Sequence, residues 1–144
     1  MNYDEMRKIL SSVLEKEDDK LDIPTEEDWK KLYKKFNCCF NKDFMNFINL
    51  MAEYSFPGDI YNVSSGKTND NDLIDFVYDY EVKSGKWNKK MIPFYGIGNG
   101  DYLCISKEKS PNTPVYYFYA ERQLSEEYCS SFEEWIKQLP TFLA

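Results

Sequence analysis

The sequence MIPFYGIGNGDYLCI, residues 91–105, consists of two apolar runs joined by a glycine-rich turn. Both runs are rich in aromatic and β-branched side chains, which favour strands. The turn, residues 96–101, contains three glycines, and glycine can adopt the positive φ angles that a tight hairpin needs. Pro93 has no N–H to donate, so we expect it at an edge or at the end of its strand. The stretch therefore predicts an antiparallel β-hairpin.

Two further strands are predicted on either side of this hairpin. Residues 115–119, VYYFY, have the highest strand propensity in the chain, and residues 59–63 form a shorter apolar run. The composition of residues 110–114, SPNTP, is typical of a turn. The strands after residue 90 follow one another too closely for helical crossovers, so we expect a mainly antiparallel sheet.

Five segments carry apolar residues at the i, i+3, i+4 and i+7 spacing of an amphipathic helix. Their apolar positions are Met6, Ile9, Leu10, Val13 and Leu14; Trp29, Leu32, Tyr33 and Phe36; Phe44, Phe47, Ile48 and Met51; Leu73, Phe76, Val77 and Tyr80; and Phe132, Trp135, Ile136 and Leu139. Each apolar stripe must be covered, and a small sheet is the natural partner.

Capping residues mark several of these helices. Thr25 and Asn41 are expected N-caps, and Ser130 and Glu133 have the spacing of a capping box. Pro140 comes after the last periodic position and is expected just beyond the end of the final helix. The pattern predicts a single α+β domain, with a mainly antiparallel sheet packed by N-terminal helices and a closing C-terminal helix.

Length and charge restrict the function classes. The chain has 144 residues, the size of one domain, with 18 Lys and Arg against 25 Asp and Glu, a net charge of −7. Nucleic-acid binding needs clustered cations, so this balance argues against it. The sequence contains no histidine, which excludes Ser-His-Asp and Cys-His catalysis and histidine-ligated zinc.

Neither a membrane segment nor an export signal is evident. No apolar run reaches the ~20 residues of a spanning helix, and the charged N-terminal region lacks the apolar core of a signal peptide. We therefore expect a cytoplasmic protein whose four cysteines are reduced, chiefly as small buried side chains. Nothing in the spacing of the cysteines indicates a metal site, and we expect no cofactor.

The glycine-rich turn also permits a second interpretation. Glycine loops can cradle phosphates, but that geometry requires a helix N-terminus after the glycines, and here a strand follows. The hairpin interpretation is therefore favoured over a ligand loop at residues 96–101. A catalytic pair among the carboxylates is a further alternative, although no spacing selects one.

One acidic segment stands out as a candidate surface for a partner. From residue 68 to residue 82 there is no Lys or Arg. Like charges at helical spacing repel one another, so a face of one sign is unusual unless it attracts a basic partner. The alternative is an ordinary solvated face whose ion partners come from elsewhere in the fold. The candidate partner-binding residues are Asp72, Asp75, Tyr78, Asp79 and Glu81.

Several motifs in this order resemble the SUKH superfamily, which includes fungal regulators of cell-wall assembly and glucan synthesis. The motifs are Ile23-Pro24-Thr25-Glu26, Phe44 with Phe47, Trp87, Ile92-Pro93-Phe94-Tyr95, Gly98-Asn99-Gly100-Asp101-Tyr102-Leu103-Cys104-Ile105, Pro114-Val115-Tyr116 and Ser131-Phe132-Glu133-Glu134-Trp135-Ile136. The resemblance covers about residues 23–139. It divides the chain into an N-terminal helix with a charged connection, residues 1–22, and a SUKH-like domain, residues 23–144.

The resemblance implies a non-enzymatic protein-binding domain. Small bacterial members resemble immunity proteins, which bind and neutralise toxins, often nucleases. The resemblance therefore implies a protein partner, a basic toxin domain, and the acidic balance of the chain agrees with one. Two alternatives are a regulatory scaffold linked to cell-wall synthesis, and a small-molecule-binding or enzymatic domain that uses the Gly96–Asp101 loop.

Overall fold

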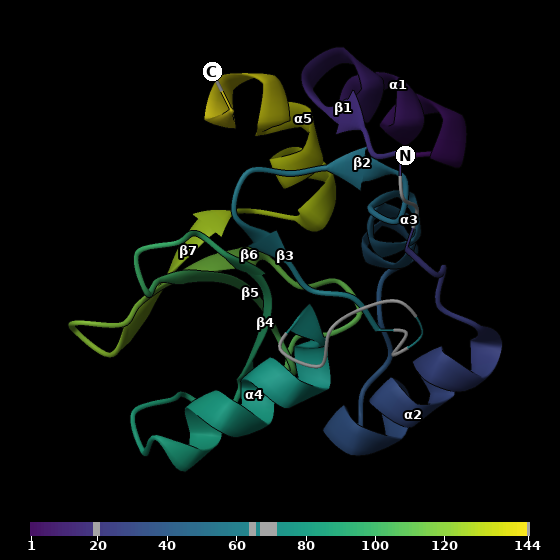
Figure 1. Cartoon of the computed structure of the whole chain (residues 1–144). Coiled ribbons are helices and arrows are strands. Elements are labelled where there is room, and N and C mark those ends of the chain that lie inside the picture. The colour runs from purple at the N-terminus through teal and green to yellow at the C-terminus, as the bar shows by residue number, and fades with distance from the viewer. Residues whose placement is uncertain (19–20, 64–65, 67–71, 144) are drawn as a thin grey trace.

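The computed structural model describes residues 1–18, 21–63, 66 and 72–143. Figure 1 shows α1, α3 and α5 gathered at one end of the molecule and α4 at the other, with the main sheet between them. The elements in chain order are α1 (Tyr3–Val13), β1 (Glu15–Lys16), α2 (Glu26–Phe36), α3 (Lys42–Leu50), β2 (Tyr54–Ser55), β3 (Asp59–Ile60), α4 (Ile74–Lys83), β4 (Met91–Gly96), β5 (Tyr102–Ser106), β6 (Val115–Tyr119), β7 (Leu124–Cys129) and α5 (Phe132–Phe142). The predicted α+β class is confirmed.

The main sheet has five strands in the order β3-β4-β5-β6-β7, and every neighbouring pair is antiparallel. The predicted hairpin is confirmed as β4 and β5, with Gly96 paired to Tyr102. The strand predicted at residues 115–119 is β6. The strand expected at residues 59–63 is shorter, because β3 pairs with β4 only through its two residues. Strand β7 and the small β1–β2 sheet were not predicted.

Pro93 lies inside β4 rather than at its end. Its place in the sheet explains why this is tolerated: β3 pairs with Tyr95 and Gly96 and does not reach Pro93, and the pairing with β5 shifts register between Pro93 and Tyr95. The ladder therefore requires no N–H from Pro93 on the β3 side.

The turn between β4 and β5 is held by its own polar groups. Gly98 and Gly100 have φ angles of +106° and +94°, which side-chain-bearing residues rarely adopt. The carboxylate of Asp101 accepts hydrogen bonds from the hydroxyl of Tyr117 at 2.8 Å and from the backbone N–H of Ala120 at 3.0 Å. These contacts stabilise the hairpin and occupy the one carboxylate of the loop.

The core is built largely of aromatic rings. Trp135 of α5 is fully buried, and its ring centroid lies 5.3 Å from that of Phe47 and 5.2 Å from that of Phe94. Phe44 and Phe132 extend this cluster at 5.3 Å from each other. Helices α3 and α5 are thereby attached to β4.

Helix α1 belongs to the same core. Met6 and Leu10 are fully buried, and α1 packs against α3 and α5. Strand β1 follows directly and pairs with β2, so that Glu15 lies opposite Ser55. The division of the chain at residue 22 stays a prediction, but the first helix is packed as an integral layer.

Two details of α5 differ from the sequence prediction. The N-cap is Ser131, not Ser130, and its hydroxyl accepts the backbone N–H of Glu134 at 3.1 Å. The helix also continues through Pro140 to Phe142. A proline removes only one hydrogen bond there, and Phe142 packs 6.1 Å from Trp135, which holds the last turn against the core.

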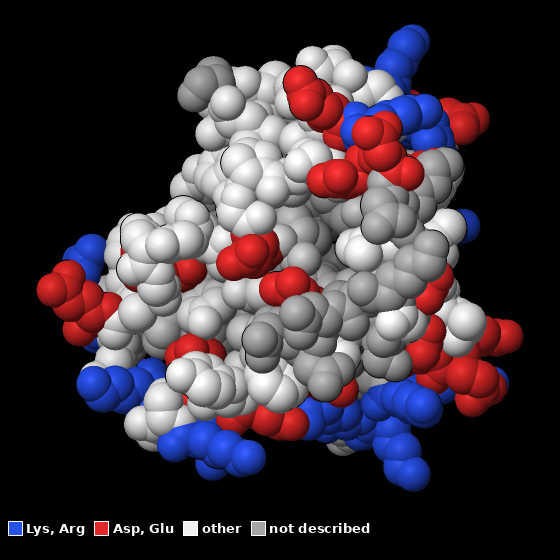
Figure 2. All heavy atoms as spheres, in the orientation of Figure 1, with Lys and Arg blue, Asp and Glu red and all other residues white. Residues whose placement is uncertain are grey.

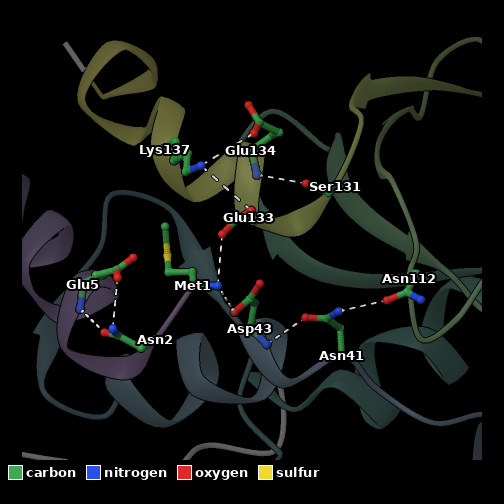
Figure 3. Close-up of polar contacts among 10 residues, drawn as sticks. All are labelled: Met1, Asn2, Glu5, Asn41, Asp43, Asn112, Ser131, Glu133, Glu134 and Lys137. Atoms are coloured by element: carbon green, nitrogen blue, oxygen red, sulfur yellow. Dashed lines mark hydrogen bonds and ion pairs between the residues drawn. The ribbon is translucent and has the colours of Figure 1, made fainter.

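The N-terminal ammonium group joins three helices (Figure 3). The nitrogen of Met1 lies 3.0 Å from a carboxylate oxygen of Glu133 in α5 and 3.8 Å from one of Asp43 in α3. The hydrogen bond between the ammonium group of Met1 and the carboxylate of Glu133 lowers the pKa of Glu133 and raises the pKa of the ammonium group. Each charged form is thus favoured by the folded state.

We expect the Glu133→Gln variant to lose the pH dependence that this contact creates. A lowered carboxyl pKa adds stability above the ordinary carboxyl value of 4.5, and this stability is lost as the pH falls through the folded-state pKa. A raised amine pKa adds stability below the ordinary value of 8.0, which is lost as the pH rises through the folded-state pKa. Urea unfolding across this range should show a broad maximum in the wild type and a flatter curve in the variant. The control is Glu134→Gln, and equal pH profiles for wild type and Glu133→Gln would contradict the prediction.

Candidate functional site

The predicted partner residues come from one segment but do not share one face. Asp72 directly precedes α4, and its backbone carbonyl accepts the N–H of Asn62 at 2.8 Å. Asp75 and Asp79 are exposed on α4, whereas Tyr78 and Glu81 are half-buried. Asp72 is also half-buried, so two of the five residues are exposed and three are half-buried.

The exposed carboxylates of α4 face basic residues of α2. The ammonium nitrogen of Lys35 lies 2.9 and 2.8 Å from the two carboxylate oxygens of Asp79. Asp75 lines a small cleft of about 160 Å³ together with Lys31 and Lys35. Exposed pairs of this kind contribute about 0–1 kcal/mol. The one-sign segment seen in the sequence is thus partly neutralised by another helix.

Tyr78 and Glu81 contribute to the fold. The hydroxyl of Tyr78 donates a hydrogen bond to the carbonyl of Lys89 at 2.8 Å, and its ring meets Phe36 edge-on at 4.8 Å. The carboxylate of Glu81 accepts a hydrogen bond from the hydroxyl of Tyr102 at 3.0 Å. Their contact with a partner stays a prediction.

Two aromatic residues that the sequence predicted on the buried stripe of α4 are instead exposed. Phe76 is 43% exposed and Tyr80 is 66% exposed, while the helix is buried through Ile74 and Val77. Apolar residues occur on more than one side of this helix, so the periodicity does not identify its buried face. The presence of this second apolar stripe was the signal in the sequence for an exposed patch.

The exposed rings line a shallow groove beside α4. We define the aromatic groove, about 360 Å³ in volume, by Tyr61, Phe76, Val77, Tyr80 and Tyr102. It lies between α4, β5 and the segment after β3.

A second hollow shares Tyr61 with this groove. We define the acidic cleft as the hollow of about 390 Å³ bordered by β2, β3 and the end of α3, with Asp59 and Asp72 in its lining. Figure 2 shows acidic side chains around the hollowed centre of this face, while the visible Lys and Arg side chains lie mostly toward its edges. Tyr61 lines both hollows, so the aromatic groove and the acidic cleft adjoin each other at this residue.

The carboxylates of this surface act on its tyrosines. Burial raises the pKa of Tyr61, and the charges of Asp59, Asp72 and Glu81 raise it further. Burial and Glu81 raise the pKa of Tyr102 in the same way. Burial, then repulsion from Asp59, raises the pKa of Asp72. The local potential is therefore negative and opposes further negative charge.

The charges of Asp59 and Asp72 have no counterion among the residues that the structure describes. Among residues 1–18, 21–63, 66 and 72–143, no side chain forms an ion pair or hydrogen bond with either carboxylate. This contrasts with Asp79, which Lys35 neutralises. Two carboxylates that repel each other without compensation are a local cost of folding, which a cation from outside would relieve.

Gly96 allows Tyr61 to take its position at the junction of groove and cleft. A methyl group at residue 96 would overlap the hydroxyl of Tyr61. The glycine predicted for the hairpin thus has a second role, because it leaves room for a tyrosine of the candidate site.

The side chains that most often bind metal ions are not clustered in the described part of the chain. No group of three or more His, Cys, Asp or Glu residues in that part is arranged to hold a metal ion. Cys104 and Cys129 are buried, whereas Cys39 is exposed. Within the same residues, none of the helices has the length and apolarity to cross a membrane.

Comparisons with known proteins identify a family and solved structures of similar fold. The family model SUKH_5, described as SMI1-KNR4 cell-wall, matches residues 6–142. Among curated proteins no significant match was found. A crystal structure of a protein from Pseudomonas syringae pv. tomato is similar, with a TM-score of 0.66, 16% identity and coverage of 95% of each chain. At this identity the structure supports the fold alone.

Proposed function

Because this chain belongs to the SUKH_5 family, SMI1-KNR4 cell-wall, over nearly its whole length, we propose that it is a non-enzymatic immunity protein that binds and neutralises a toxin domain. The observation that carries this proposal is the acidic cleft next to the aromatic groove, which share Tyr61 in their linings. Exposed aromatic rings are common anchors of protein interfaces. A negative surface favours a basic partner.

The candidate residues of α4 have different roles in this proposal. Asp75 is exposed and increases the rate of encounter with a basic toxin by long-range attraction, whereas Asp79 is paired with Lys35 and adds less. Asp72 lines the acidic cleft. Tyr78 and Glu81 fix the helix to Lys89 and Tyr102, so that the interface is preorganised when the toxin arrives.

The proposal is tested by co-expression with the toxin domain encoded by the gene next to this one. The chain should restore growth of cells that produce the toxin, and the two purified proteins should form a complex. If growth is not restored and no complex forms, the proposal is wrong. A regulatory scaffold would instead bind several cell-wall proteins and leave toxicity unchanged.

The double variant Asp75→Lys, Asp79→Lys should associate with the toxin about tenfold more slowly, because charge reversal removes electrostatic attraction. The effect should shrink at high salt, where charges are screened. The measurement is the association rate by surface plasmon resonance. The matched control is Glu126→Lys, Glu127→Lys, which makes the same charge change on exposed positions of β7. Equal slowing in both variants would show that net charge, not the α4 surface, sets the rate.

A further inference from the structure

We propose that the aromatic groove and the acidic cleft together bind an arginine side chain of the partner protein. Residues next to that arginine would pack on the exposed rings of Phe76 and Tyr80. This inference rests on the proposed function and deepens it, because it states which chemistry of the partner is recognised.

Helix α4 and strand β5 supply the apolar side of the proposed site. Tyr80 and Phe76 are exposed one helical turn apart, and Tyr61 and Tyr102 line the same groove. The centroids of the last two rings are 6.3 Å apart, and their planes are tilted by 46°. Large exposed rings that gather around one groove are typical of a surface that another molecule covers.

Two carboxylates of the acidic cleft supply the charged side of the proposed site. Asp59 and Asp72 are close enough to repel each other, and neither is neutralised by a described side chain. A cation placed between them would be attracted by both. Tyr61 lines the same cleft, and the face of an aromatic ring attracts positive charge.

Arginine matches this combination better than lysine or a metal ion does. Its planar guanidinium can stack on tyrosine while its N–H groups donate to two carboxylates. Lysine offers a strongly hydrated point charge with no plane to stack. A hard metal ion needs six or more oxygen ligands, whereas one wall of this site is hydrocarbon.

The test uses the intact chain, labelled with ¹⁵N, and N-acetyl-arginine amide as the probe. At millimolar probe concentration, NMR shifts should concentrate on the backbone amides of Tyr61, Phe76, Tyr80 and Tyr102. The neutral analogue N-acetyl-citrulline amide should cause much smaller shifts, and N-acetyl-lysine amide should bind more weakly than the arginine probe. Shifts spread over the whole surface, or equal shifts with citrulline, would overturn the proposal.

Variants identify the groups responsible. Asp72→Asn should weaken probe binding several-fold. Tyr80→Ala should weaken it to a similar extent, because it removes one of the rings that line the groove. The matched control is Asp4→Asn, at an exposed position of α1 that lines neither the groove nor the cleft, and it should leave probe binding unchanged. All three changes lie on accessible positions, and the NMR spectrum itself reports whether each variant is folded. Equal probe affinity in Asp72→Asn and wild type would contradict the proposed site.

The same variants separate this inference from the proposed function. If the wild-type chain neutralises the toxin and Tyr80→Ala does so equally well, the groove proposal is wrong and the immunity function stands. If the arginine probe binds at the groove but no toxin is neutralised, the immunity function is wrong and the arginine site stands.

Discussion

Replacing Trp135 by alanine is expected to lower the free energy of unfolding by about 3–5 kcal/mol. The indole is fully buried where α5 meets the sheet, with Phe47, Phe94 and Phe132 within 5.5 Å between ring centroids. Its removal eliminates the apolar contacts of a large ring and leaves a cavity that rigid aromatic neighbours cannot fill. Few domains have more than about 5–15 kcal/mol to lose.

Thermal and urea unfolding measure this effect. A loss of this size lowers the melting temperature by roughly 10–20 °C for a chain of this length. Lys30→Ala, at an exposed position of α2, is the surface control and should change stability by less than about 0.5 kcal/mol. A loss below about 1 kcal/mol for Trp135→Ala would contradict the aromatic core described here.

A second substitution at this position tests the polar side of the indole. Among the described residues, the buried ring N–H of Trp135 has no hydrogen-bond partner. Trp135→Phe therefore removes an unsatisfied donor together with part of the ring, and the first change offsets the second. It should cost clearly less than Trp135→Ala.

Replacing Gly58 by alanine is the second change with a large expected effect, about 2–4 kcal/mol of destabilisation. Gly58 has a φ angle of +86°, and a methyl group there would lie 2.7 Å from both the carbonyl oxygen of Gly96 and the ring of Tyr95. The backbone oxygen cannot move without disturbing β4. The side chain of Tyr95 is also held, because its hydroxyl donates to the carbonyl of Pro57 at 2.6 Å.

The matched control is Gly98→Ala. Gly98 has a φ angle of +106°, but its added methyl group would meet nothing within 4 Å. Both variants carry backbone strain, and only Gly58→Ala adds a collision, so the difference between their unfolding free energies isolates the collision. Equal costs would show that strain alone matters. Gly58→Ala should also displace β3 and weaken binding at the groove, because Tyr61 follows that strand directly.

Local patterns in the sequence were sufficient to predict most of the sheet and the helices. The β4–β5 hairpin follows from glycines that accept positive φ angles between two apolar runs, and β6 follows from five residues of high strand propensity. The N-caps Thr25 and Asn41 are confirmed, since a cap is a contact between residues two or three positions apart. The family resemblance is confirmed by the match over residues 6–142.

Short strands of low propensity were beyond the reach of such patterns. Strand β1 consists of Glu15 and Lys16, and it exists only because β2 lies beside it. Strand β7, LSEEYC, alternates poorly because it lies at the sheet edge and is largely exposed. Pairing between segments far apart in the chain decides such strands, so their own residues contain little signal.

The candidate site, too, was predictable from the sequence only in part. The sequence by itself determined the acidity of the chain, the absence of histidine chemistry, the helix that became α4 and the family to which the chain belongs. Only the tertiary structure decided which side of α4 is exposed, because that depends on which apolar residues β4 covers. It also neutralised Asp79 with Lys35 while leaving Asp59 and Asp72 without a described counterion. Charge compensation acts through space between distant residues, and the order of residues along the chain does not specify it.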